Sequence, residues 1–186
     1  MRCGLLPKKF FPSIISALLL LMVVAISFAA SPKPEPDVVK LLPVKDSVKG
    51  WEVYPQTLVY AFGKNLTLIY DGGFELYTKN GVLDAAQQMY RTKSPEIIAT
   101  VTVHRLTSSQ SAKLFYERWW KSDKKQKTYK PVKALRDGYT YAANGAVNGY
   151  SYRGRFFVTL SIGSEMSRAD AEAFMEWVDK AIGKLT

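Results

Sequence analysis

The sequence contains almost no cysteine or histidine, with one residue of each among 186. Cys3 precedes an apolar stretch at the start of the chain and is expected to be removed with it. A chain without cysteine cannot form disulfides, use a catalytic thiolate or bind a metal through thiolates. His104 has no second histidine with which to complete a metal site, and its strand position beside Thr100 and Thr102 predicts a solvated side chain. We therefore expect neither a metal nor a cofactor.

Motifs that mark common enzyme classes are missing as well. No phosphate-binding loop, dinucleotide-binding fingerprint or calcium-binding loop occurs. Residues 149–153, Gly-Tyr-Ser-Tyr-Arg, come close to a nucleophile elbow but lack its final glycine, and they lie in a predicted strand before a hairpin. These absences favour a non-catalytic protein, and we assign no catalytic residues.

The first 29 residues have the pattern of a secretory signal peptide. Basic residues at positions 2, 8 and 9 precede an apolar run over 14–28, and Ser27 and Ala29 place small side chains at the −3 and −1 positions of a cleavage site. This pattern predicts cleavage after Ala29 and export to the periplasm or cell envelope. The alternative is an uncleaved membrane anchor, although residues 14–30 fall slightly short of the roughly 20 residues that span a bilayer.

The rest of the chain divides into a short arm and one domain. Removal of three basic residues and no acidic ones with the signal peptide lowers the formal net charge from +10 to +7. Residues 30–44 begin with prolines that alternate with charged residues, which predicts an extended proline-rich tether. Residues 45–186 are numerous enough to form a single domain with its own core.

Period-two alternation predicts antiparallel strand pairs. Residues 96–104 and 155–162 alternate between two faces, and each has an upstream partner, at 82–92 and 138–152 respectively. We expect turns at 93–95 and at 153–154.

Each predicted strand pair precedes a helix. Capping signals at 107–110 and 167–170 open these two helices. A third helix is predicted over 66–80, with Gly81 as its C-terminal stop. The fold class is therefore α+β, an antiparallel sheet covered by helices. The two strand–strand–helix units resemble each other around Asn-Gly pairs, which indicates either a duplication or the chance recurrence of common turn residues.

Residues 71–77, Asp-Gly-Gly-Phe-Glu-Leu-Tyr, admit two interpretations. On a helix, Asp71 and Glu75 lie four residues apart on one face and could serve a hydrolase as acid and base. Alternatively, Gly72 and Gly73 allow the helix to pack closely against the sheet, while Glu75 pairs with Lys79 at the surface. We favour close packing, because each glycine costs about 1 kcal/mol in a helix relative to alanine and some contact must offset that cost.

The same segment carries a resemblance to a known family. The motif consists of Trp51 after a glycine, then Asp71, Gly72, Gly73, Glu75 and Tyr77, then Gly81. It resembles a bacterial family of exported proteins and lipoproteins that is catalogued only as a domain of unknown function. Family members have Asn at the position of Asp71, Ala at that of Phe74 and Phe at that of Val82. The resemblance covers residues 41–186 and implies an exported α+β domain, without catalytic residues to carry over.

Positive charge is concentrated in residues 121–136, named here the basic segment. It holds seven cationic side chains against one acidic residue, Asp123, and directly follows two tryptophans. The candidate binding residues are Trp119, Trp120, Lys121, Lys124, Lys125, Lys127, Lys130, Lys133 and Arg136. A flexible cationic loop beside tryptophans suits an anionic surface, such as anionic lipid, lipopolysaccharide or an acidic envelope protein. Export argues against nucleic acid as the partner.

The sequence therefore predicts an exported, non-catalytic binding or accessory module that contacts an anionic surface through the basic segment. Three alternatives stay open at this point. The basic segment could be a solvated loop that only aids solubility, the protein could be a hydrolase that uses Asp71 and Glu75, or it could be a structural subunit of an envelope complex.

Overall fold

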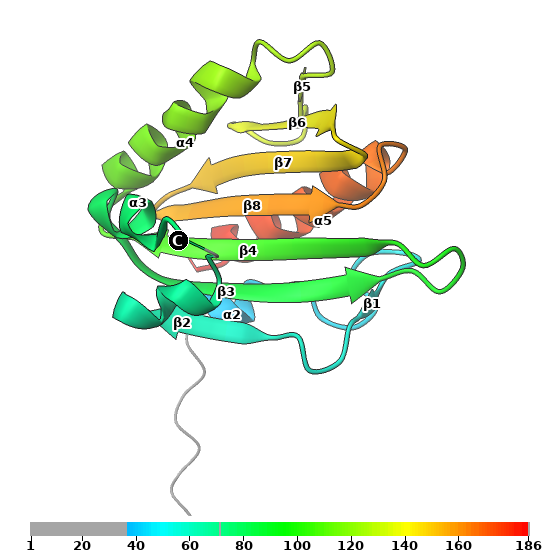
Figure 1. Cartoon of the computed structure of the whole chain (residues 1–186), viewed down its shortest axis with the longest axis horizontal. Helices are drawn as coiled ribbons and strands as arrows, with labels where there is room; N and C mark the ends of the chain where they lie inside the picture. Colours follow the sequence, from blue (N-terminus) through cyan, green and yellow to red (C-terminus); the bar gives the residue numbers. More distant parts are fainter. Residues whose placement is uncertain (1–36, 71, 186) are drawn as a thin grey trace, which may run out of the picture. The chain divides into compact units, whose positions relative to one another are not determined.

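One antiparallel sheet organises the part of the chain that the computed structural model describes, residues 37–70 and 72–185 (Figure 1). Eight strands of this part follow the order β1-β3-β4-β8-β7-β6-β5, with β2 paired to β3 beside β1. All the strand pairs are antiparallel. The strands are β1 (Glu52–Val53), β2 (Val59–Phe62), β3 (Val82–Arg91), β4 (Ile98–Leu106), β5 (Lys130–Pro131), β6 (Gly138–Ala143), β7 (Ala146–Arg153) and β8 (Phe156–Ile162). The predicted α+β class with an antiparallel sheet is confirmed.

The two long helices cover opposite faces of this sheet, as Figure 1 shows with α4 in front and α5 behind. α4 (Ser109–Asp123) buries Phe115 and Tyr116 against Tyr139 and Phe157. α5 (Arg168–Gly183) buries its apolar stripe in the other core cluster, where Phe174 is almost fully buried. Successive residues of a strand point to opposite faces, which is why neighbouring strand residues enter different clusters.

The two strand–strand–helix units exist in chain order, as β3-β4-α4 and β7-β8-α5. β4 pairs with β8 at the centre of the sheet. If the two units were related by a two-fold rotation about an axis perpendicular to the sheet between β4 and β8, their strand pairs would exchange and both helices would lie on the same face. Because α4 and α5 pack on opposite faces, the two units differ in the placement of their helices.

The predicted strand over residues 138–152 is wrong in one respect, since it is two strands rather than one. β6 and β7 form a hairpin joined at Asn144 and Gly145, whose φ angles are 53° and 77°. Positive φ at both central residues is the requirement of the tight hairpin turns that favour Asn-Gly. The turn after β7 lies where it was predicted, between Arg153 and Phe156.

The chain enters the fold earlier than the sequence suggested. Residues 37–44 were assigned to the tether, but α2 (Asp37–Lys40) is helical and buries Val38 and Val39 in the core cluster beside α5. Leu41 and Leu42 are buried there as well. The apolar run of these four residues outweighs the extended preference of the preceding prolines. The predicted signal peptide and tether residues 30–36 lie outside the described residues.

The helix predicted over 66–80 is also wrong, because the segment forms two separate helical pieces. The 3₁₀ helix η2 (Gly63–Leu68) ends before the glycine pair, and α3 (Phe74–Lys79) begins after it. Gly72 and Gly73 have φ angles of 75° and 72°, a left-handed conformation that breaks a right-handed helix. The stop predicted at Gly81 is confirmed, since α3 ends at Lys79 and Gly81 has φ 89°.

Candidate functional site

The basic segment is an ordered extension of α4 and the sheet, and the prediction of a flexible loop is wrong. Lys121 belongs to α4, and Lys130 belongs to β5, which pairs with β6. Between them, the Thr128 hydroxyl donates to the Ala142 carbonyl at 2.6 Å. Arg168 on α5 donates to the Thr128 carbonyl at 2.7 Å. These bonds hold the backbone of the basic segment against the end of the sheet.

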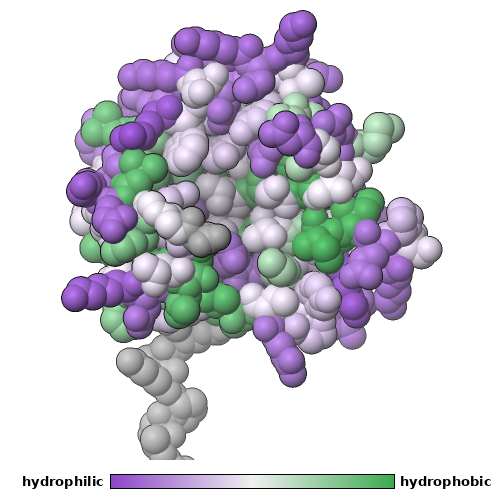
Figure 2. All heavy atoms as spheres, in the orientation of Figure 1, coloured by the Kyte–Doolittle hydropathy of each residue, from purple (hydrophilic) through white to green (hydrophobic). Residues whose placement is uncertain are grey.

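The cations of the basic segment are all exposed: Lys121, Lys124, Lys125, Lys127, Lys130, Lys133 and Arg136. Figure 2 shows the corresponding end of the molecule, at the top, covered mainly by hydrophilic side chains. Among the described carboxylates, none lies within ion-pair distance of the six lysines, and Arg136 has only a 3.7 Å contact with its neighbour Asp137. The positive charge is therefore available to an external partner.

The one acidic residue of the basic segment is turned into the protein. Asp123 is buried at the end of α4, and its Oδ2 accepts a hydrogen bond of 2.7 Å from the Tyr139 hydroxyl. Burial raises the pKa of this carboxyl, and the hydrogen bond from Tyr139 opposes the rise. Asp123 therefore does little to neutralise the exposed lysines around it.

The two tryptophans predicted to accompany the lysines have different surroundings. The Trp120 indole N–H donates to the Tyr129 hydroxyl at 3.2 Å, and the Lys124 ammonium lies 4.0 Å from the Trp120 ring centroid. Trp120 therefore stays with the basic segment. Trp119 instead packs into the α4 face of the sheet, where its ring stacks on Tyr150 at a centroid distance of 5.8 Å.

The described residues of the family-like motif are dispersed over the fold, and three of them pack against other parts of the chain. Trp51 is buried and meets Phe174 of α5 edge-on at 5.3 Å. Tyr77 stacks on Tyr70 at 3.6 Å. A Cβ on Gly81 would lie 2.8 Å from the Thr107 hydroxyl oxygen, so this glycine does pack closely.

The two interpretations of residues 71–77 both need correction. A Cβ on Gly72 or Gly73 would meet nothing within 4 Å, so the close packing predicted for them is absent. Their role is the positive φ that only glycine adopts readily. The helix with the exposed Glu75 begins at Phe74, so it does not carry position 71 and offers no shared face for the two carboxylates. Asp71 itself lies outside the described residues.

The prediction that His104 is solvated is wrong. Its side chain shares a face of β4 with Thr100 and Thr102, as expected, but this is the face on which α4 packs, and aromatic rings cover the part around His104. His104 is buried, stacks with Tyr70 and Tyr77 at about 5.8 and 5.7 Å, and its Nδ1 lies 2.9 Å from the Phe157 carbonyl oxygen. Burial lowers its pKa to about 4, against a smaller opposing effect of that hydrogen bond. The alternation of the strand predicted on which face the His104 side chain lies, but it could not predict which side chains cover that face.

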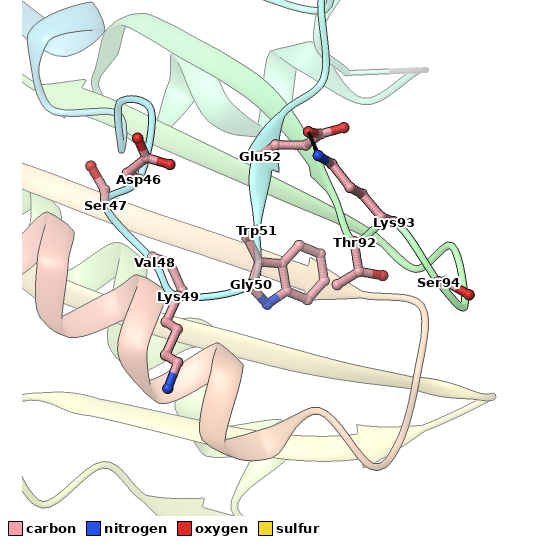
Figure 3. Close-up of a pocket in the computed structure, with 10 residues that line it drawn as sticks. All are labelled: Asp46, Ser47, Val48, Lys49, Gly50, Trp51, Glu52, Thr92, Lys93 and Ser94. Atoms are coloured by element: carbon pink, nitrogen blue, oxygen red, sulfur yellow. Dashed lines mark ion pairs between the residues drawn. The ribbon is translucent and has the colours of Figure 1, made fainter.

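A broad, open cleft of about 910 Å³ lies between β1, the loop before it and the β3–β4 turn (Figure 3). Its charged groups balance one another, since Glu52 pairs with Arg91 at 2.9 Å and with Lys93 at 3.6 Å. Figure 3 shows Lys49 directed away from this pair. The buried Trp51 side chain packs in the core. This arrangement does not define a ligand class.

A second depression lies on the α4 face, where the helices leave part of the sheet open. We name it the polar groove, and its volume is about 220 Å³. Its lining residues come from four adjacent strands and two helices: Tyr77, Gln87, Thr100, Thr102, Trp119, Asn148, Tyr150, Thr159, Leu160 and Ser161. Sequence reasoning did not single out this set, because its members are spread over 85 positions and only the strand order brings them together.

Within residues 37–70 and 72–185, no cluster of three or more histidine, cysteine or acidic side chains could hold a metal ion. In the same part of the chain, no helix is both long and apolar enough to cross a membrane.

Comparison with known proteins gives a likeness of fold. No family model matches the chain, and no curated protein is similar to it. A solved structure that is similar is the extracellular domain of PknH from Mycobacterium tuberculosis, with 12% sequence identity and a TM-score of 0.55. The match covers 82% of this chain and 98% of that domain. At this identity the likeness shows a shared fold, and the resemblance to the exported bacterial family stays a prediction.

Proposed function

We propose that this protein is an exported, non-catalytic binding module that contacts an anionic surface of the cell envelope through its basic segment. The signal peptide predicted for residues 1–29 supports the location. The structural likeness supports it too, because nearly all of a domain described as extracellular matches this chain. The signal peptide is expected to be cleaved after Ala29, and the intact mass of the exported protein tests this directly.

The observation that carries the proposal is the separation of charge in the basic segment. Seven cationic side chains are exposed at one end of the sheet, while Asp123 is withdrawn into a buried hydrogen bond with Tyr139. An unneutralised group of cations held on ordered backbone loses less conformational freedom on binding than the same charges on a flexible loop. The arrangement therefore suits a surface of many negative charges, and an anionic lipid bilayer is the partner we propose.

Co-sedimentation with vesicles tests this proposal. We expect binding to phosphatidylglycerol-containing vesicles but not to phosphatidylcholine vesicles, with a sharp decrease at high salt, because exposed charges are screened within about 8 Å at physiological ionic strength. Each lysine near an anionic membrane contributes about 1 kcal/mol. The triple variant Lys124→Gln, Lys125→Gln, Lys127→Gln should therefore bind up to roughly a hundredfold more weakly at low salt.

A matched control removes the same charge elsewhere. Lys45, Lys49 and Lys184 are exposed and lie outside the basic segment, so their replacement by Gln should leave most of the binding. Both triple variants should keep the melting temperature, because exposed charges contribute little to folding. Equal binding of both variants, or binding to neutral vesicles, would contradict the proposal. Binding to lipopolysaccharide or an acidic protein, but not to phosphatidylglycerol, would replace the partner we name.

The structural-subunit alternative has one observation in its favour. Phe62 and Leu68 expose 57% and 69% of their surface beside β2, and among the described strands β2 pairs only with β3. Exposed apolar side chains at an unpaired strand edge are typical of protein contacts. If this edge binds a subunit, Phe62→Glu should dissociate a complex recovered from the envelope, whereas Leu114→Glu on α4 should not. The hydrolase alternative has no observation in its favour.

A further inference from the structure

The polar groove lies on the open part of the α4 face, separate from the basic segment. The sheet register aligns its floor in two rows across the strands. Gln87 pairs with Thr102, which pairs with Thr159, which pairs with Tyr150. The second row runs from Thr100 to Ser161 to Asn148. Paired residues share a face, so all these side chains rise from one side of the sheet.

The floor of the groove offers hydrogen-bonding groups that the protein itself does not use. Gln87 donates to the Thr102 hydroxyl at 3.0 Å. The side chains of Thr100, Asn148, Thr159 and Ser161 form no hydrogen bond with other described residues. Hydroxyls and amides both donate and accept, so this floor can bind either kind of group.

The groove has no charge of its own. None of its ten lining residues is ionisable near neutral pH. The cations of the basic segment lie at the end of α4 and at β5, beyond the strands that line the groove. Figure 2 shows the same contrast, with mostly pale side chains of intermediate hydropathy at the centre of this face and strongly hydrophilic ones at the top. An anionic or cationic ligand would lose its hydration here without gaining an ion pair, which favours a neutral ligand.

Aromatic rings form the wall of the groove. Trp119 and Tyr150 stack with an interplanar angle of 18°, and Tyr141 lies nearly parallel to Tyr150, at 3°. Tyr77 of α3 contributes a further ring. The Trp119 indole N–H is shielded from solvent and has no acceptor among the described residues. Aromatic rings beside unused neutral donors and acceptors suit a ligand that has both apolar C–H faces and many hydroxyls.

We propose that the polar groove is a binding site for a neutral saccharide. The C–H face of a sugar ring would pack on the aromatic wall, and its hydroxyls would exchange hydrogen bonds with Thr100, Asn148, Thr159 and Ser161. The volume of 220 Å³ equals that of about seven water molecules at roughly 30 Å³ each, which is room for one sugar ring. A longer glycan would place its remaining rings outside the groove.

Titration with defined sugars, followed by NMR of the ¹⁵N-labelled protein, tests the proposal. The probes are glucose, N-acetylglucosamine and their β1,4-linked disaccharides. The indole N–H signals of Trp51, Trp119, Trp120 and Trp177 are separate reporters, and the variant Trp119→Phe assigns the second of them. We expect a saturable shift of the Trp119 signal with at least one probe, and unchanged Trp51 and Trp177 signals.

Variants of the floor locate the site. Asn148→Ala and Ser161→Val should each weaken binding tenfold or more while the melting temperature stays near that of the parent. Asn65→Ala, at an exposed position on η2, is the matched control and should bind normally. The triple variant Lys124→Gln, Lys125→Gln, Lys127→Gln should also keep full sugar affinity, which separates this site from the basic segment. A Trp119 signal that no probe moves, or binding that survives both floor variants, would overturn the proposal.

Discussion

The buried histidine makes the stability of this protein depend on pH in a defined direction. His104 packs beside the stacked rings of Tyr70 and Tyr77 on the α4 face, and burial lowers its pKa from 6.5 to about 4. The perturbation to compare is His104→Phe, which keeps a ring in the stack and removes the titrating group. Because the chain has a single histidine, no second imidazole contributes to the difference between the two proteins.

The sign and size follow from linkage between protonation and folding. The unfolded chain takes up the proton near pH 6.5, whereas the folded protein resists it until about pH 4. The contribution of His104 to stability is therefore complete above about pH 6.5 and is lost as the pH falls toward 4. The whole loss is about 3 kcal/mol, since each pKa unit corresponds to about 1.4 kcal/mol, and about 2 kcal/mol is lost by pH 5.

Urea unfolding monitored by tryptophan fluorescence, at pH values from about 5 to about 7.5, measures this loss. The parent should lose about 2 kcal/mol of stability more than His104→Phe across this range. The raised pKa of Asp123 has the opposite effect, because its contribution falls as the pH rises, but it is common to both proteins and cancels in the difference. Phe115→Leu, a change in the same cluster, should lower stability and keep the parental pH dependence. If the free energy of unfolding changes equally with pH in the parent and in His104→Phe, the burial of a neutral imidazole is refuted.

Three further predictions concern the fold. Gly73 has φ 72°, and a Cβ placed on it would meet nothing within 4 Å. Gly73→Ala and Gly73→Leu should therefore each lower the free energy of unfolding by about 1 kcal/mol. A much larger effect of Leu than of Ala in thermal unfolding would restore the close-packing interpretation. Asp123→Ala should lower the free energy of unfolding by about 1–3 kcal/mol, because it leaves the buried Tyr139 hydroxyl without its acceptor. Asp123→Asn keeps an oxygen at this position and should lower it less in the same measurement. Phe174→Ala should lower the free energy of unfolding in urea by about 3–5 kcal/mol, because the Phe174 ring packs on Trp51 and Tyr90. Leu185→Ala, at an exposed position, should change it by less than about 0.5 kcal/mol. Similar losses for the two variants would refute the assigned core.

Local patterns in the sequence predicted much of the fold, because they act between residues close in the chain. The alternation in residues 155–162 predicted β8 to within a residue, and the upstream partner expected at 82–92 is β3, also to within a residue. The alternation in 96–104 predicted β4, which begins and ends two residues later. The capping signals placed the starts of α4 and α5, although the side chain that caps α4 is Ser108, which accepts from the Ser111 N–H. Gly81 was correctly expected to end a helix.

Other local patterns misled where two tendencies competed. The spacing of apolar residues in 66–80 fits a helix, but the left-handed Gly72 and Gly73 divide it. The prolines of 31–36 indicated a tether through residue 44, but the apolar side chains of α2 are buried in the core. In both places the backbone preference of a few residues had to be weighed against burial, and burial depends on parts of the chain far away in sequence.

The sequence by itself determined the class of the protein: an antiparallel α+β domain behind a predicted export signal, with its positive charge gathered in residues 121–136. Only the tertiary structure decided how those residues are presented, since the inward turn of Asp123 at the end of α4 depends on Tyr139 of β6, sixteen residues away. The polar groove was likewise beyond the sequence, because Gln87, Thr102, Thr159 and Tyr150 become one row only through the order β3-β4-β8-β7. Composition and periodicity predict features of residues that are close in the chain, whereas a binding surface depends on which strands become neighbours in the sheet.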